Sequence, residues 1–203
     1  MSIDQLKATI SKKGGLSQAN RFNVMFTPPQ GSLLNSDPAT LIGGLASGGG
    51  LSNIVNDPRD ISLLAESVNL PSSQITTLDH IAEKQSVKIP YAVIQEEVTM
   101  TFLLTNDYYI KNLFDKWGQS IIDLETYRVA YKKDIVTDVV IQQLNKQNIP
   151  IYGVKLENAF PTTIGGIALS NESADTPNKL TVTFSYDKYV VEDGLTSAIS
   201  GLG

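Results

Sequence analysis

The chain contains no cysteine among its 203 residues and a single histidine, His80. The lack of cysteine excludes disulfide frameworks, thiolate zinc sites, iron–sulfur clusters and thiol catalysis. One histidine leaves almost no material for a two-histidine metal site or a catalytic triad, so we interpret His80, beside Asp79 in a polar stretch, as a surface residue. We therefore expect no catalytic residue, no cofactor, no metal site and no enzyme activity.

Long hydrophobic runs are also lacking. The longest apolar runs are a few residues, far short of the roughly 20 that a membrane-spanning helix needs, so we expect no membrane partner. The first 13 residues, MSIDQLKATISKK, contain no apolar core of a secretory signal, and we expect none. Basic residues number 16 against 21 acidic ones, a net charge of −5, which argues against tight binding of nucleic acid through phosphate neutralisation.

Three compositional regions divide the chain. Residues 1–20 are interpreted as an N-terminal arm, in which Ser2 and Gln5 have the spacing of a helix capping box. The predicted helix covers residues 2–13 and places three apolar residues on one face: Ile3, Leu6 and Ile10. Residues 21–190 are interpreted as one β domain, and residues 191–203 as a loose C-terminal tail.

A glycine- and serine-rich stretch at about 31–58 interrupts that domain. Its apolar residues follow neither the helical nor the strand period, so we interpret it as an insertion between strands. The motif GGLASGGG resembles a phosphate-binding loop but lacks the lysine that such a loop requires.

Alternating polar and apolar residues predict strands in most of the domain. Two β-like pieces within 74–94 predict a long hairpin or projecting loop. The other predicted strands are 21–27, 60–69, 96–105, 127–134, 135–144, 149–160 and 179–191.

One helix is predicted over 107–121, capped by Asn106 or Asp107. Its apolar residues recur at helical spacing, so we expect them in the core: Ile110, Leu113, Phe114 and Trp117. The order of elements predicts a mainly β (α+β) fold, a β-sandwich or part-barrel with one covering helix.

Long, exposed strand edges are an aggregation hazard unless a partner pairs them, and assembly into a closed barrel removes that hazard. Glu96 and Glu97 cannot act together as a catalytic carboxylate pair, because adjacent residues on a strand point to opposite faces. A small-molecule-binding β-barrel, which would need a deep inward pocket, stays open as an alternative.

Several segments, in this order, resemble the tail tube proteins of contractile-tailed bacteriophages. They are NRFNVMF (20–26), SVNLP (67–71), VTMTFLLTNDYYIKNLFDKW (98–117), YKKDIVTDVVIQQLN (131–145), LENAFPTTIGGIALS (156–170) and LTVTFSYDKY (180–189). The resemblance implies a virion protein, made in the host cytoplasm, whose hexameric rings join their strands into a β-barrel and stack into a hollow tube for genome delivery. The implied partners are other copies of the chain, the tail sheath, the baseplate hub or tube initiator, and a tape measure protein in the lumen. The tube proteins of other contractile injection and secretion systems, and baseplate tube initiators, resemble the chain in the same way and remain alternatives.

The resemblance also implies that some strands line the lumen, through which DNA passes without specific binding. The best candidates are strands whose second face is polar, at 97–105 and 179–187, whereas either face of 136–144 is mixed. We therefore expect the lumen-facing residues to be Glu97, Thr99, Thr101, Thr181, Thr183, Ser185 and Asp187.

Overall fold

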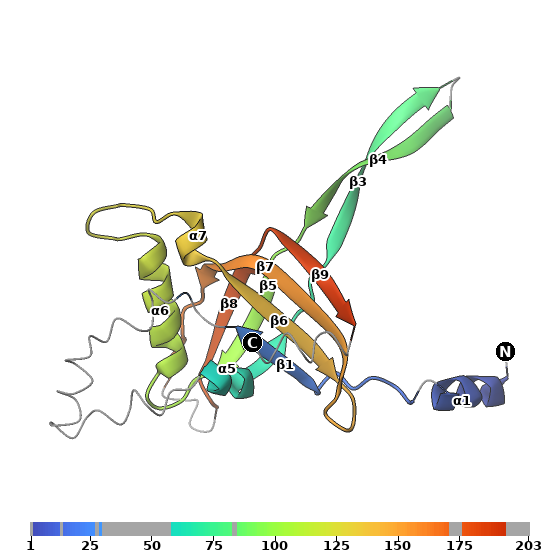
Figure 1. Ribbon diagram of the computed structural model, residues 1–203, viewed down its shortest axis with the longest axis horizontal. Helices are drawn as coiled ribbons and strands as arrows, with labels where there is room; N and C mark the ends of the chain where they lie inside the picture. Colours follow the sequence, from blue (N-terminus) through green and yellow to red (C-terminus); the bar gives the residue numbers. More distant parts are fainter. Residues whose placement is uncertain are drawn as a thin grey trace.

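The computed structural model describes residues 2–12, 14–26, 29, 58–82, 85–170 and 176–193. Nearly all of the expected insertion at 31–58, and residues 194–203 of the expected tail, lie outside the described residues. Elements are labelled as in Figure 1. Their bounds, in chain order, are α1 Ile3–Lys12, β1 Phe22–Phe26, α5 Pro58–Leu64, β2 Ala65–Val68, β3 Ser73–Ala82, β4 Gln85–Gln95, β5 Val98–Leu103, α6 Tyr109–Ile121, α7 Lys132–Ile135, β6 Thr137–Leu144, β7 Pro150–Ile164, β8 Lys179–Ser185 and β9 Lys188–Asp193.

The fold is mainly β, as the sequence predicts, and its strands pair antiparallel. Hydrogen bonds connect the strands in the order β1-β6-β7-β8-β5-β2, and β9 also pairs with β7. The long strand β7 joins two halves of this sheet: its first part pairs with β6 and β9, and residues 160–164 pair with β8. Asn158 lies at this junction with a left-handed backbone, φ 55°. The two halves therefore behave as two layers that share one strand.

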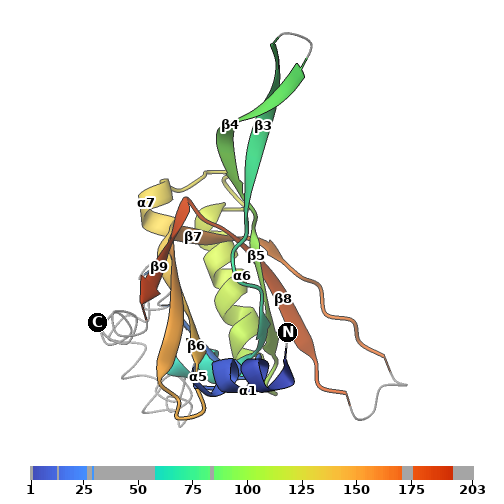
Figure 2. The same ribbon diagram turned by 90° about the vertical axis from the view of Figure 1, so that its right-hand side faces the viewer.

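The core lies between these two layers, and helix α6 fills the space between them (Figure 2). The four α6 residues expected in the core, Ile110, Leu113, Phe114 and Trp117, are all buried. Phe26 from one layer and Phe184 from the other each lie 6.0 Å from the Trp117 ring, centroid to centroid. The interior is thus filled with packed side chains rather than hollow.

Two segments extend away from this body. Strands β3 and β4 form a two-stranded hairpin that projects from one end, which confirms the hairpin predicted within 74–94 (Figures 1 and 2). Helix α1, predicted over 2–13, is also present, and it buries none of its residues. The capping box is partly formed, because the Asp4 amide donates to Ser2 Oγ at 3.3 Å and the Ser2 amide donates to Gln5 Oε1 at 3.4 Å.

One of the predicted strands, 60–69, is only partly correct, and another, 127–134, is wrong. Residues 60–64 belong to helix α5, in which Pro58 occupies the first turn, where its missing N–H is no loss, and Ile61 is buried in the core. Only residues 65–68 of that prediction form a strand. Residues 127–134 form a loop that runs into α7, with one isolated bridge between Ile122 and Val129.

The predicted cap of the helix is wrong as well. Helix α6 begins at Tyr109, after Tyr108 in a left-handed conformation, and no side chain caps it. The Asp107 carboxylate accepts a hydrogen bond from the Thr105 hydroxyl and only a long one, 3.4 Å, from the Tyr109 amide. A tight turn over residues 105–108 therefore starts the helix, with the Tyr108 amide donating to the Thr105 carbonyl.

Candidate functional site

A stripe of hydroxyl groups runs across β5 and β8 on the face opposite the core. Thr99 lies directly opposite Thr183, and Thr101 opposite Thr181, with 3.5 Å between the hydroxyl oxygens of the second pair. The residues that alternate with them on β5, Val98, Met100 and Phe102, are fully buried. The pleat therefore separates an apolar inner face from a threonine outer face. We call these four threonines the threonine stripe.

The remaining expected lumen residues differ in their placement. Glu97 is exposed and lies directly before β5, in line with Thr99. Ser185 is the last residue of β8. The predicted strand over 179–191 is broken after Ser185, so Asp187 lies in the turn between β8 and β9 and not on the strand that carries the stripe.

Asp187 belongs to a separate polar contact between four elements. Its carboxylate forms an ion pair with Lys132 of α7 and accepts a hydrogen bond of 3.0 Å from the Asn158 side chain. The backbone N–H of Asn158 donates to the side chain of Asp138 of β6 at 3.2 Å. The hydrogen bonds from Lys132 and then Asn158 lower the pKa of Asp187 below its ordinary value of 3.8. This contact holds the turn against the junction of the two layers.

The outer face of the other layer carries charges of both signs. Lys155 pairs with Asp138 at 2.8 Å, and Lys188 pairs with Glu157 at 2.9 Å. The hydrogen bond with Asp138 raises the pKa of Lys155. The outer faces of the two layers thus differ in their chemistry: four threonine hydroxyl groups dominate one, with the Lys179–Glu66 ion pair at its end, and the other carries two ion pairs without such a stripe.

The layer that carries the stripe has two open edges. On one side it ends at β2, which pairs only with β5, and on the other side at residues 160–164 of β7, which pair only with β8 among the described strands. The sequence indicated β2 only as part of a longer strand. Its position at an edge follows from the sheet order, for which the sequence carries no local signal.

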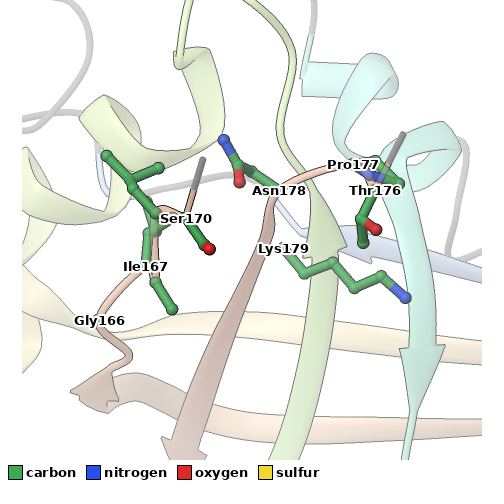
Figure 3. A pocket seen from close by; sticks show the side chains of 9 residues that line it. Gly166, Ile167, Ser170, Thr176, Pro177, Asn178 and Lys179 are labelled. Atoms are coloured by element: carbon green, nitrogen blue, oxygen red, sulfur yellow. The ribbon is translucent and has the colours of Figure 1, made fainter. Parts of the chain in front are cut away.

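Figure 3 shows a surface groove between residues 166–170 and 176–179. Its one charged side chain, Lys179, is paired with Glu66 of β2. No group of three or more metal-binding side chains occurs in the part of the chain that the structure describes. In those same residues no helix has the length and apolar character to cross a membrane.

Comparison with protein families places these features in context. The family described as phage tail tube protein matches residues 17–192, which include every described strand except the last residue of β9. The chain belongs to the phage tail tube protein family. A comparison with curated protein sequences finds no match.

Solved structures of low sequence identity share the fold of this tail tube protein family member. A chain of the anti-feeding prophage baseplate is 14% identical, with a TM-score of 0.58, over 88% of this chain and 96% of that chain. A chain of the sheath–tube complex of the extracellular contractile injection system PVC is 15% identical, with a TM-score of 0.57, over 95% and 99% of the two chains. A chain of the sheath/tube terminator structure of the same system is 15% identical, with a TM-score of 0.56, over 86% of this chain and 95% of that chain.

Proposed function

We propose that this chain is the structural subunit of the inner tail tube of a contractile phage tail. Its hexameric rings stack into a hollow conduit through which DNA passes into the host. The observation that carries the proposal is the family match over residues 17–192, combined with a layer that has two open edges and a threonine-lined outer face. In this role the chain catalyses no reaction and needs no cofactor.

Ring closure follows from the two open edges. Residues 160–164 of β7 on one copy and β2 on the next each offer unpaired backbone groups, so their pairing would continue the layer from subunit to subunit. Repetition around the ring closes the layers into one β-barrel without edges. The threonine stripe then faces the lumen, together with Glu97 and Ser185.

The chemistry of this face suits a passage for DNA. Hydroxyl groups and the Glu97 carboxylate offer no cation to the phosphates, and the ammonium group of Lys179, at the start of β8, is paired with Glu66. A ring of lysines repeated at each layer would bind phosphates at many points and would slow the passage of DNA.

The partners proposed for this subunit follow from its two faces. With the threonine stripe inside, the ion-paired face of the other layer lies toward the outside of the tube, where the sheath would contact it. The baseplate hub or tube initiator would bind one end of the tube, and a tape measure protein would occupy the lumen before DNA. The protein would reside in the virion tail after synthesis in the host cytoplasm.

A non-phage contractile injection device is the second candidate, favoured by the fold shared with the anti-feeding prophage and PVC chains. Electron microscopy of the purified protein tests the common proposal. We expect six-fold rings or hollow filaments, whereas a protein that remains monomeric at all concentrations would contradict it. Particles isolated from the source then separate the candidates: DNA-filled capsids joined to the tubes indicate a phage tail, and tubes without capsids indicate an injection device. A location confined to the baseplate would indicate a tube initiator.

A further inference from the structure

Strand pairing breaks where the β3–β4 hairpin joins the body of the subunit. In the body, Val68 is the last residue of β2 and pairs with Met100 of β5. In the hairpin, Ser73 is the first residue of β3 and pairs with Gln95 of β4. Residues 69–72 carry the chain from one sheet to the other, and among the described strands none pairs with both. The sheet of the body therefore does not continue into the hairpin that projects from it (Figures 1 and 2).

Two backbone hydrogen bonds cross this junction. The Asn69 N–H donates to the Thr99 carbonyl at 3.1 Å, and the Glu96 N–H donates to the Ser72 carbonyl at 3.2 Å. Both bonds run between the same two segments of chain, so they form a narrow two-stranded ribbon. A ribbon of this kind resists separation of its strands but can bend out of its own plane. The direction of the hairpin needs a further restraint.

Two tyrosine hydroxyl groups supply contacts from outside the ribbon. The Tyr186 hydroxyl donates to the Glu96 carbonyl at 2.8 Å, and the Tyr189 hydroxyl donates to Ser73 Oγ at 3.4 Å. Glu96 directly follows β4, whereas Ser73 begins β3, so each tyrosine holds a different chain of the ribbon. We call these two hydrogen bonds the root contacts. Attachment at two points opposes bending of the ribbon.

The segment that carries both tyrosines is itself fixed to the body. Tyr186 belongs to the core, with 9% of its side chain exposed, and its ring packs against that of Tyr189 at 6.5 Å between centroids. Between them, Asp187 is held by Lys132 and Asn158. Burial raises the pKa of Tyr186 above its ordinary value of 10.0, so its hydroxyl stays protonated and able to donate at neutral pH. The root contacts therefore start from a rigid support.

We propose that Tyr186 and Tyr189 are positioning residues that set the direction of the β3–β4 hairpin in the free subunit, before any tube forms. The positioning itself does not depend on the proposed function. Its effect on assembly does rest on that function: a hairpin already held in one direction loses little orientational freedom when subunits join, so tubes form at a lower protein concentration.

Distances between two spin labels test the positioning in the dispersed subunit. The natural lack of cysteine makes introduced cysteines unique labelling sites. Nitroxide labels at Leu78→Cys on the hairpin and Lys116→Cys on α6, both exposed positions, report the distance from hairpin to body by pulsed electron paramagnetic resonance. The labelled protein with both tyrosines should give one narrow distribution of distances. Tyr186→Phe combined with Tyr189→Phe keeps the rings and removes the hydroxyl groups, and should give a broader distribution.

Two controls separate positioning from a general loss of structure. Tyr91→Phe removes a hydroxyl from an exposed side chain on the hairpin itself and should leave the distribution narrow. In the double phenylalanine variant, the fluorescence of the single tryptophan, Trp117, should match that of wild type because the core stays packed.

Removal of the acceptor provides an independent test of one root contact. Ser73→Ala takes away the hydroxyl that accepts from Tyr189, so it should broaden the distribution as Tyr189→Phe does. Because both changes remove the same hydrogen bond, combining them should broaden it no further. A further broadening in the combined variant would show that the two side chains act separately, and would overturn this contact as a positioning device.

Tube assembly supplies the last readout. The double phenylalanine variant should need a roughly threefold to tenfold higher protein concentration to form tubes than wild type, the range that corresponds to an ordinary hydrogen bond. A distance distribution as narrow as that of wild type, or an unchanged concentration for assembly, would overturn the inference. If the wild-type protein formed no tubes, the proposed function would fail, whereas the spin-label distances would still confirm or overturn the positioning.

Discussion

The indole nitrogen of Trp117 donates a hydrogen bond of 2.8 Å to the backbone carbonyl of Ile135. Trp117 is on α6 and is fully buried, and Ile135 is the last residue of α7, separated from β6 by Val136 alone. This bond fixes α6 against the start of the layer that carries the ion pairs. Both the aromatic packing and the hydrogen bond therefore depend on one side chain.

Replacing Trp117 should separate these two contributions. Trp117→Ala should lower the free energy of unfolding by about 3–5 kcal/mol, the usual cost of a large cavity in a core. Trp117→Phe keeps most of the packing but leaves the buried Ile135 carbonyl without its donor, which costs about 1–3 kcal/mol. Urea unfolding of the dispersed subunit measures both values. A melting curve of the alanine variant equal to that of wild type would show that Trp117 is not part of the core.

The Asp187 contact should make stability depend on acid. Because the pKa of Asp187 is lower in the folded state than its ordinary value of 3.8, its contribution is fully present above about that pH. The contribution is lost as the pH falls through the lower, folded-state pKa. The Asp187→Asn variant should therefore lose less stability than wild type as the pH falls through this acid range. Thermal melts at a series of pH values measure this difference. Asp134→Asn makes the same change of charge on α7 and should leave the pH profile like that of wild type; if both variants behaved alike, the contact would have no specific role.

Tyr127 should be strained in the free subunit. Its backbone is left-handed, φ 51°, with its N–H donating to the Asp123 carbonyl at 2.8 Å, and its side chain is 80% exposed. A left-handed conformation costs an ordinary residue roughly 1–2 kcal/mol, and glycine avoids most of this cost. Tyr127→Gly should therefore raise the free energy of unfolding by up to about 1 kcal/mol. Tyr131→Gly is the matched control, since Tyr131 has an ordinary φ of −67°, and should not stabilise the subunit. If the two substitutions changed the free energy of unfolding equally, the backbone of Tyr127 would not be strained.

A cation in the lumen should slow DNA. Glu97→Lys places an ammonium group beside the threonine stripe in every subunit, so stacked rings would present many phosphate-binding groups. We expect tubes of normal form but slower DNA passage, with the effect strongest at low salt because ions screen the attraction. Glu125→Lys makes the same change of charge in the exposed loop after α6 and is the control. If the variant ejected DNA as fast as wild type at both low and high salt, Glu97 would not line the lumen.

The sequence predicted those elements in which each face lies in one environment along its whole length. In β5 one face is buried and the other carries threonines, so the period of two is visible in the sequence. Helix α6 has a buried face for the same reason. The sequence also predicted that Thr99 and Thr101 share one face of their strand and that Thr181 and Thr183 share one face of theirs. The pairing of Thr99 with Thr183 depends on the register between the two strands, which no single strand encodes.

The errors arose where distant residues decide the local structure. Residues 60–64 form a helix because Ile61 packs into a core built from other elements. The predicted strand at 179–191 breaks after Ser185, where Lys132 and Asn158 hold the turn at Asp187. Both contacts join residues far apart in the sequence, so periodicity alone carries no sign of them.

A cryo-EM reconstruction of tubes assembled from the purified protein tests the central claim most directly. The account predicts a six-fold hollow tube in which β2 of one subunit pairs with residues 160–164 of the next, and the threonine stripe lines the inner wall. A reconstruction with the threonine stripe on the outer surface, or with the layers unconnected between subunits, would contradict it.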